Sequence, residues 1–257
     1  MTTNTAGATT TATKVALITG GNRGLGLAAA RHLGRAGATV VIAARDEEQS
    51  HRAVLALRSD DIWASAVRVD VTEPVSIAAA VDRVTRDHGR LDILVNNAGI
   101  LPEATAADAD QPLDLDLFTR TFRTNVLGAV AVTQAFLPLL TASVAGRIVN
   151  VSSTMGSLSD QVDPESPYFG MVVPAYQTSK AALNGLTIAL SKALAGSSIK
   201  VNSVCPGWVQ TDLGGPENRA AAPTPADEAA LVIATAALLG TDGPSGTFFD
   251  ASGPIGW

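Results

Sequence analysis

Apolar residues along the chain alternate between short continuous runs and stretches with helical spacing. The runs are rich in Val and Ile, which is typical of strands buried on both faces. The predicted strands are residues 15–18, 39–43, 66–69, 91–95, 147–151, 199–204 and 246–249. The predicted helices include residues 24–36, a polar helix ending near Leu57, residues 75–87 after Pro74, and residues 174–194. This alternation predicts right-handed crossovers and a mostly parallel sheet covered by helices on both faces.

The pattern predicts a single-domain, doubly wound α/β fold of the Rossmann type over residues 14–257. A length of 257 residues suits one core, and the interior contains no repeat and no low-complexity linker. Residues 1–13 are rich in Thr and Ala, and they lack the positive start and apolar middle of a secretory signal, so we expect a floppy tail. Residues 214–225, rich in Pro and Ala, are predicted to form a mobile surface loop.

Composition excludes several classes of protein. The net charge is −6, and the sequence contains no clustered stripe of basic residues, so nucleic acid is not an expected partner. Apolar runs stay below the roughly 18 residues of a membrane span. The single cysteine, Cys205, excludes an intrachain disulfide and favours a reducing, cytoplasmic location. The three histidines are scattered, so we expect no metal site.

A glycine-rich segment, residues 19–26 (TGGNRGLG), directly follows the first predicted strand and opens the first helix. Small residues allow a tight turn and a close approach to a pyrophosphate, whose charge is favoured by a helix N-terminus. A glycine pattern in this strand–turn–helix context indicates dinucleotide binding.

Further motifs follow in a fixed order along the chain. They are the Gly-x-x-x-Gly-x-Gly spacing at Gly20, Gly24 and Gly26, the segment 96–99 (NNAG), Asn125, the pair 152–153 (SS), the segment 176–180 (YQTSK) and the pair 206–207 (PG). Together they resemble the short-chain dehydrogenase/reductase family. Residues 20–24, 204–209 and 243–246 are most similar to carbonyl reductases. The resemblance implies an oxidoreductase that transfers a hydride between NADP(H) and a ketone, an aldehyde or the corresponding alcohol.

The expected cofactor is NADP(H) because the end of the second strand offers positive charge in place of a carboxylate. An NAD enzyme needs a carboxylate there for the ribose hydroxyls, whereas this chain has Ala44 followed by Arg45. Arg45 and Arg23 would bind a 2′-phosphate, although Asp46 could partly neutralise Arg45. The resemblance implies these cofactor-binding residues: Gly20, Asn22, Arg23, Gly24, Leu25, Gly26, Arg45, Asp70, Val71, Asn97, Ala98, Gly99, Tyr176, Lys180, Pro206, Gly207, Val209 and Thr211.

The candidate acid–base pair is Tyr176 and Lys180, which are four residues apart and share one helix face. A neighbouring ammonium group is expected to lower the pKa of the phenol toward the working range. The resemblance implies that Tyr176 protonates the product oxygen, that Ser153 polarises the carbonyl, and that Lys180 also binds the nicotinamide ribose. It further implies that Asn125 holds a water next to Lys180. The implied substrate-binding residues are Ser153, Met155, Tyr176 and Trp208.

Some questions stay open at this level. Ser153 and Tyr176 are 23 positions apart, a separation that is longer than in compact family members. The extra residues 159–173 would form either a lid or a subunit contact.

A nucleotide-sugar epimerase or dehydratase is an alternative function, but such a protein has a different glycine spacing and an additional domain. A dinucleotide-sensing regulator is another, but such proteins usually lack the Tyr–Lys pair. The resemblance implies a homo-oligomer, a dimer or a tetramer, acting on a small carbonyl or alcohol substrate of unspecified identity.

Overall fold

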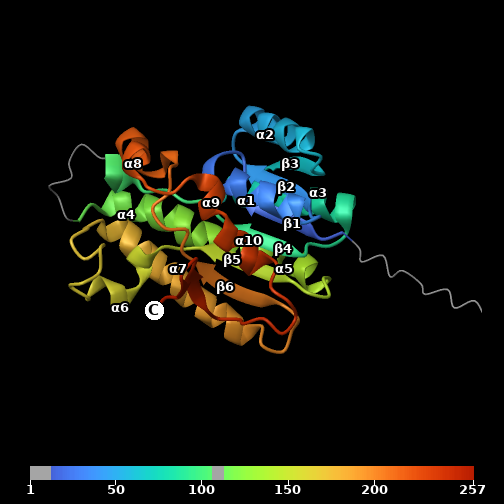
Figure 1. Cartoon of the computed structure of the whole chain (residues 1–257). Helices are drawn as coiled ribbons and strands as arrows, with labels where there is room; N and C mark the ends of the chain where they lie inside the picture. Colours follow the sequence, from blue (N-terminus) through green and yellow to red (C-terminus); the bar gives the residue numbers. More distant parts are fainter. Residues whose placement is uncertain (1–12, 106–112) are drawn as a thin grey trace, which may run out of the picture.

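The computed structural model describes residues 13–105 and 113–257. Most of the predicted N-terminal tail, residues 1–12, lies outside the described residues. The remainder forms one α/β unit with a central sheet between two layers of helices, as the sequence predicts (Figure 1).

The sheet has eight strands in the order β3-β2-β1-β4-β5-β6-β7-β8. Neighbours from β3 to β7 run parallel, and only the last pair is antiparallel. The strands are β1 (Val15–Thr19), β2 (Thr39–Ala44), β3 (Ala64–Arg68), β4 (Ile93–Asn96), β5 (Arg147–Val151), β6 (Lys200–Val204), β7 (Phe248–Asp250) and β8 (Gly253–Pro254). The edge strand β3 begins two residues earlier than predicted because Ala64 and Ser65 continue the pairing with Val40 and Val41 of β2.

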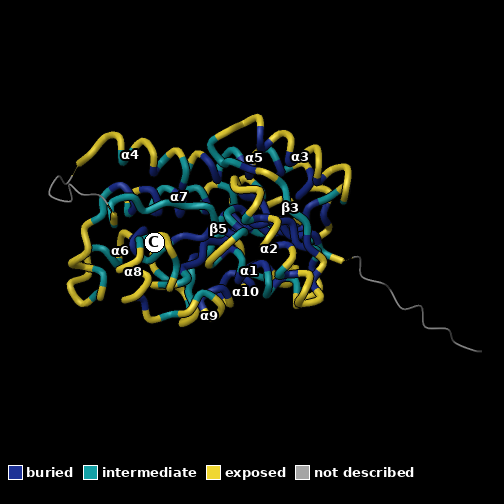
Figure 2. The backbone as a smooth tube through the Cα atoms, turned by 90° about the horizontal axis from the view of Figure 1, so that it is seen from above, coloured by how far each residue is buried: buried dark blue, intermediate teal, exposed yellow. Residues whose placement is uncertain are grey.

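Helices cover both faces of the sheet. The long helices are α1 (Gly24–Arg35), α2 (Glu47–Ser59), α3 (Pro74–His88), α4 (Leu115–Phe122), α5 (Ala129–Thr141) and α7 (Pro174–Ala193). The short ones are α6 (Leu158–Gln161), α8 (Gly215–Ala221), α9 (Ala226–Ala229) and α10 (Leu231–Ala237). Helices α1, α2 and α10 enclose one apolar core against the sheet, and α3 and α5 enclose the other. Figure 2 shows that the deeply buried chain runs along the central strands, while the outer helices carry the exposed positions.

The apolar stretch Leu115–Thr141 is a continuous helix of 27 residues, long and apolar enough by composition to cross a membrane. In the fold its second half is a core helix, because Val132, Phe136 and Leu140 of α5 are fully buried against the sheet. Between α4 and α5 the helix widens into a π-helical segment, η2 (Arg123–Gly128).

The predicted loop over residues 214–225 is wrong for residues 214–221, which are helical. Asp212–Gly214 form a 3-10 turn, η4, and Gly215–Ala221 form α8. Pro216 lies in the first turn of α8, where a missing N–H costs no helical hydrogen bond. The alanines that follow are good helix formers. The Pro/Ala composition in this segment therefore marks the start and body of a short helix.

Candidate active site

The predicted functional residues converge on one edge of the sheet, because the carboxyl ends of parallel strands lie together. Residues 20–26 follow β1, Arg45 follows β2, Asp70 and Val71 follow β3, residues 97–99 follow β4, Ser153 follows β5, and residues 206–211 follow β6. Helix α7 brings Tyr176 and Lys180 to the same edge, where it packs against η2 and the 3-10 turn η3 (Thr154–Gly156).

Tyr176 and Lys180 are both buried, at 6% and 5% exposure. Lys180 Nζ donates a hydrogen bond to the main-chain oxygen of Val151 at 2.7 Å. Burial lowers the pKa of Lys180 to about 8, because the apolar surroundings disfavour the ammonium form. The same burial shifts the pKa of Tyr176 in the opposite direction.

The expected lowering of the Tyr176 pKa by Lys180 is wrong for this structure. Burial raises the pKa of Tyr176, and the nearby Cys205 raises it further, while a hydrogen bond with Ser153 lowers it only in part. Desolvation prevails because the charged phenolate would have few polar partners. A phenol in this environment keeps its proton at neutral pH, which suits a proton donor.

Asn125 lies in the π-helical segment η2, a local widening that is frequent at functional sites. Its Oδ1 accepts from the Ile100 amide at 2.9 Å, and its Nδ2 donates to the Ile100 oxygen at 3.0 Å and to Ser179 Oγ at 3.1 Å. Asn125 therefore ties the loop after β4 to α7, directly beside Lys180.

The loop carrying Ser153, the predicted catalytic serine, also packs closely on α7. A Cβ atom at Gly156 would lie 2.6 Å from Cβ of Lys180, so only glycine fits there without a shift. Cys205 Sγ accepts hydrogen bonds from both the amide and the hydroxyl of Thr154, next to Ser153. These contacts hold Ser153 at a fixed position relative to Tyr176.

The glycine turn after β1 fits a dinucleotide pyrophosphate. Gly20 and Gly24 have φ angles of +63° and +50°, and a Cβ atom at Gly26 would lie 2.4 Å from the Gly20 oxygen. Asn97 Nδ2 donates to the Thr19 oxygen at 2.8 Å, which fixes the loop after β4 against this turn. Among the described residues no side chain caps the N-terminus of α1, so its first amides can bind phosphate.

The adenosine end carries the predicted basic residues. Arg45 is exposed just after the buried Ala44. Asp46 does not pair with it, because its carboxylate accepts from Gln49 N at 2.9 Å and Gln49 Nε2 at 2.8 Å, as the cap of α2. Partial burial raises the pKa of Asp70, but hydrogen bonds from Thr72 and the charges of Arg45 and Arg68 outweigh it and lower that pKa.

Arg23 is engaged in a contact that the sequence did not reveal. Its guanidinium pairs with Asp212 at 3.2 Å, and Arg219 of α8 pairs with the same carboxylate at 2.9 Å. The side chain of Thr211 lies beside Gly24. The segment η4–α8 therefore lies against the glycine turn, and Arg23 would have to leave or share Asp212 to reach a 2′-phosphate.

The predicted substrate residues Met155 and Trp208 differ in exposure. Met155 is buried in η3, whereas Trp208 is 43% exposed. The Trp208 indole donates from Nε1 to Asn218 Oδ1 of α8 at 3.0 Å, so α8 fixes the orientation of this ring. Val209 forms an isolated bridge with Thr224, which attaches the end of the same segment.

The extra residues between Ser153 and Tyr176 form α6 and a series of turns near the C-terminus (Figure 2). Ser159 N donates to the Trp257 oxygen at 3.0 Å, and Gln177 Nε2 of α7 donates to the Met171 oxygen at 3.0 Å. Phe169 and Met171 remain exposed in this chain.

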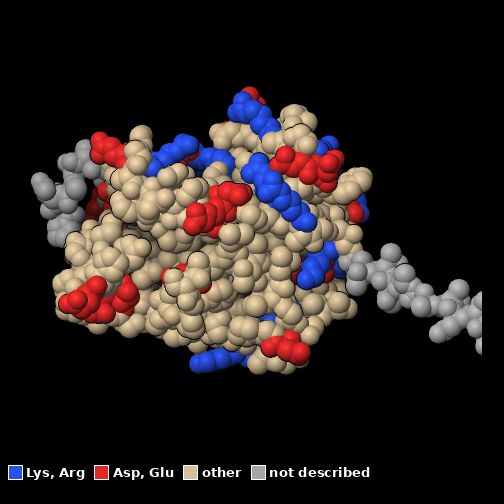
Figure 3. All heavy atoms as spheres, in the orientation of Figure 1, with Lys and Arg blue, Asp and Glu red and all other residues tan. Residues whose placement is uncertain are grey.

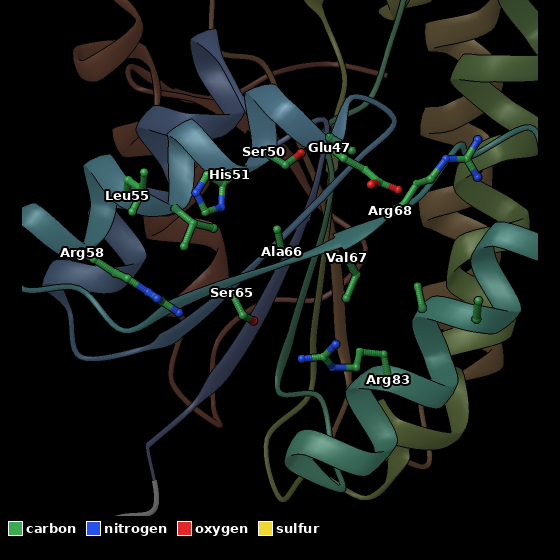
Figure 4. A pocket seen from close by; sticks show the side chains of 14 residues that line it. Glu47, Ser50, His51, Leu55, Arg58, Ser65, Ala66, Val67, Arg68 and Arg83 are labelled. Atoms are coloured by element: carbon green, nitrogen blue, oxygen red, sulfur yellow. The ribbon is translucent and has the colours of Figure 1, made fainter.

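One groove on the surface lies apart from this site. Figure 4 shows a groove at the edge strand β3, lined by His51 and Arg58 of α2 and Arg83 of α3, and none of the predicted catalytic residues contributes to it. On the face shown in Figure 3, acidic and basic side chains are interspersed, with no continuous basic stripe among the residues drawn. Within residues 13–105 and 113–257, no group of three His, Cys, Asp or Glu side chains could hold a metal ion.

Comparison with known proteins places the chain in a family. Residues 14–222 match the family described as short chain dehydrogenase. The chain is 31% identical to (+)-neomenthol dehydrogenase of Capsicum annuum, with 93% of this chain and 96% of that protein covered. The structure of NADPH-bound carbonyl reductase from chicken fatty liver superposes with a TM-score of 0.79 at 29% identity, covering 95% and 98% of the two chains. Salutaridine reductase from Papaver somniferum gives a TM-score of 0.76 at 28% identity, covering 93% and 99%.

These findings, together with the fold and the converging motifs, define the class of protein. The chain belongs to the short-chain dehydrogenase/reductase family and is an oxidoreductase.

Proposed function

We propose that this oxidoreductase uses NADPH to reduce a ketone or an aldehyde to an alcohol. The observation that carries the proposal is the buried Tyr176 phenol, which interacts with Ser153 and has the Lys180 ammonium group over its ring. Both residues lie at the edge of the sheet where the glycine turn opens. The similarity to a neomenthol dehydrogenase, a salutaridine reductase and an NADPH-bound carbonyl reductase supports the same chemistry.

NADPH, when bound, would supply the hydride. The glycine turn and the amides of α1 would hold its pyrophosphate, and Asn97 to Gly99 together with Lys180 would hold the nicotinamide ribose. Arg45 would bind the 2′-phosphate, since it is exposed and Asp46 is occupied as a helix cap. Arg23 would assist after exchanging its contact with Asp212.

The protein's own residues would bind the substrate oxygen and donate a proton to it. Ser153 would donate a hydrogen bond to the carbonyl oxygen, which stabilises the negative charge that develops there. Tyr176 would donate its proton to that oxygen, because its raised pKa keeps the phenol protonated until a strong base forms beside it. Lys180 would supply positive charge beside the phenol and be held in place by Val151.

The direct test is a screen of NADPH oxidation with aliphatic, aromatic and bicyclic ketones, with NADH assayed in parallel. We expect at least one ketone class to be reduced, with preference for NADPH. A protein that binds NADPH tightly yet reduces nothing in a broad screen would contradict the proposal and favour a dinucleotide-sensing regulator.

A further inference from the structure

We propose that Glu103 is a positioning residue for the proton donor: its carboxylate caps helix α7 and fixes Tyr176 relative to the cofactor loop. No motif in the sequence points to this residue, and it lies 73 positions before Tyr176. The kinetic part of this inference rests on the proposed reductase function, whereas the structural part does not.

Glu103 accepts two hydrogen bonds from the first turn of α7. Its Oε1 lies 2.8 Å from the Ala175 amide nitrogen, and its Oε2 lies 2.9 Å from the Tyr176 amide nitrogen. The first amides of a helix lack partners within the helix. The residue at the usual capping position, Val173, has an apolar side chain that forms no such bond. Glu103 supplies the missing acceptors from a distant segment.

The charge of Glu103 suits this place. A carboxylate at a helix N-terminus is stabilised by the helix dipole, and its hydrogen bonds to amides are stronger than those of a neutral acceptor. The two bonds reach adjacent amides, one of them belonging to Tyr176 itself. They therefore restrict both the translation of the helix end and the rotation of the Tyr176 backbone.

Glu103 lies in the 3-10 turn η1 (Pro102–Thr105), which continues the loop after β4. Three residues earlier, the Ile100 amide donates to Asn125 and the Ile100 oxygen accepts from it, and Asn125 also donates to Ser179 of α7. The loop is thus attached to α7 at two points. The same loop begins with Asn97, which is bonded to the glycine turn.

One short stretch, residues 97–103, therefore connects the proposed cofactor cradle to the backbone of the proton donor. Catalysis by a positioned acid depends on the distance and angle between the reacting groups, and a displacement of about 1 Å can cost on the order of 100-fold in rate. Removing the Glu103 carboxylate leaves the phenol, Lys180 and the glycine turn in place. Turnover should fall while NADPH affinity is retained.

The experiment compares Glu103→Ala and Glu103→Gln with Asp114→Ala in the full chain. Asp114 is a matched control, because its carboxylate also accepts two amide bonds, from Asp116 at 2.8 Å and Leu117 at 3.1 Å, at the N-terminus of α4. Hydrogen–deuterium exchange of residues 174–180 measures the cap directly. Steady-state kinetics and NADPH titration measure its consequence.

We expect Glu103→Ala to speed exchange at Ala175 and Tyr176 at least tenfold and to lower kcat by about 10- to 100-fold, with the NADPH Kd within twofold of wild type. Glu103→Gln, which keeps one acceptor oxygen, should fall between Glu103→Ala and wild type. Asp114→Ala should leave kcat and exchange at these two amides unchanged. Unchanged exchange in Glu103→Ala would overturn the cap, and unchanged kcat would overturn the positioning role. If wild type reduced no ketone, the reductase proposal would fail, while the exchange result would still decide the cap.

Discussion

The ammonium nitrogen of Lys180 lies 5.4 Å from the centre of the Tyr176 ring, and both side chains are buried. Burial acts on them in opposite directions. It raises the pKa of Tyr176 and lowers the pKa of Lys180 to about 8, because in each case the neutral form is favoured. The residue that changes charge near neutral pH is therefore the lysine.

NADPH binding should consequently weaken as the pH rises from 7 to 9. Lys180 is protonated below its pKa of about 8 and loses its positive charge above it, so the hydrogen bonds that it would form with the ribose hydroxyls become weaker. The measurement is the NADPH Kd against pH by fluorescence titration, with a midpoint expected near pH 8. In Lys180→Met the affinity should be weaker at pH 7 and constant across this interval. A wild-type Kd that does not change between pH 7 and 9 would contradict this role of Lys180.

Arg45→Ala should reduce the preference for NADPH over NADH about tenfold. Arg45 is exposed, so we take the lower end, about 1.5 kcal/mol, of the range for hydrogen bonds to a charged group. The measurement is kcat/KM with both cofactors. Arg52→Ala is a suitable control, because Arg52 is also exposed on α2 and pairs with Glu48 away from the site. An equal preference in Arg45→Ala and wild type would show that Arg45 does not bind the phosphate.

The strands, the mostly parallel sheet and the positions of the motifs could be predicted from the sequence, because each depends on local spacing along the chain. Ser153 follows a predicted strand directly, and Tyr176 and Lys180 are one helical turn apart. Contacts such as Glu103 with α7 and Arg23 with Asp212 could not, since they join irregular segments far apart in the chain. No hydrophobic periodicity in the sequence indicates these contacts.

The direction of the Tyr176 pKa shift could not be predicted from the sequence either. Spacing places a lysine near the phenol, but the extent of burial depends on how the whole sheet edge is packed. Helix α8 was missed for a related reason. A short helix docked through Asn218 and Arg219 is stabilised by tertiary contacts more than by its own pattern.

Gly156→Ala should lower both stability and turnover. The added methyl group would lie 2.6 Å from the backbone carbon and Cβ of Lys180, so the serine loop and α7 must separate. Overpacking of this kind costs about 1–3 kcal/mol. The measurement is the free energy of unfolding in urea, together with kcat. Gly196→Ala is the control, because apart from its own residue and its two chain neighbours nothing lies within 4 Å of its added carbon. If Gly156→Ala were as stable and active as this control, the close contact of the two elements would be wrong.

The central claim is that Tyr176 is the proton donor of a reductase, and Tyr176→Phe tests it most directly. Phenylalanine keeps the buried ring and removes only the hydroxyl group, so the fold and the NADPH Kd should be preserved. The measurement is kcat for NADPH-dependent reduction of the best ketone found in the screen. We predict a fall of at least about 10²–10⁴-fold, the usual contribution of a positioned acid or base. A Tyr176→Phe enzyme that reduces the ketone at nearly the wild-type rate would contradict the account, whatever its affinity for NADPH.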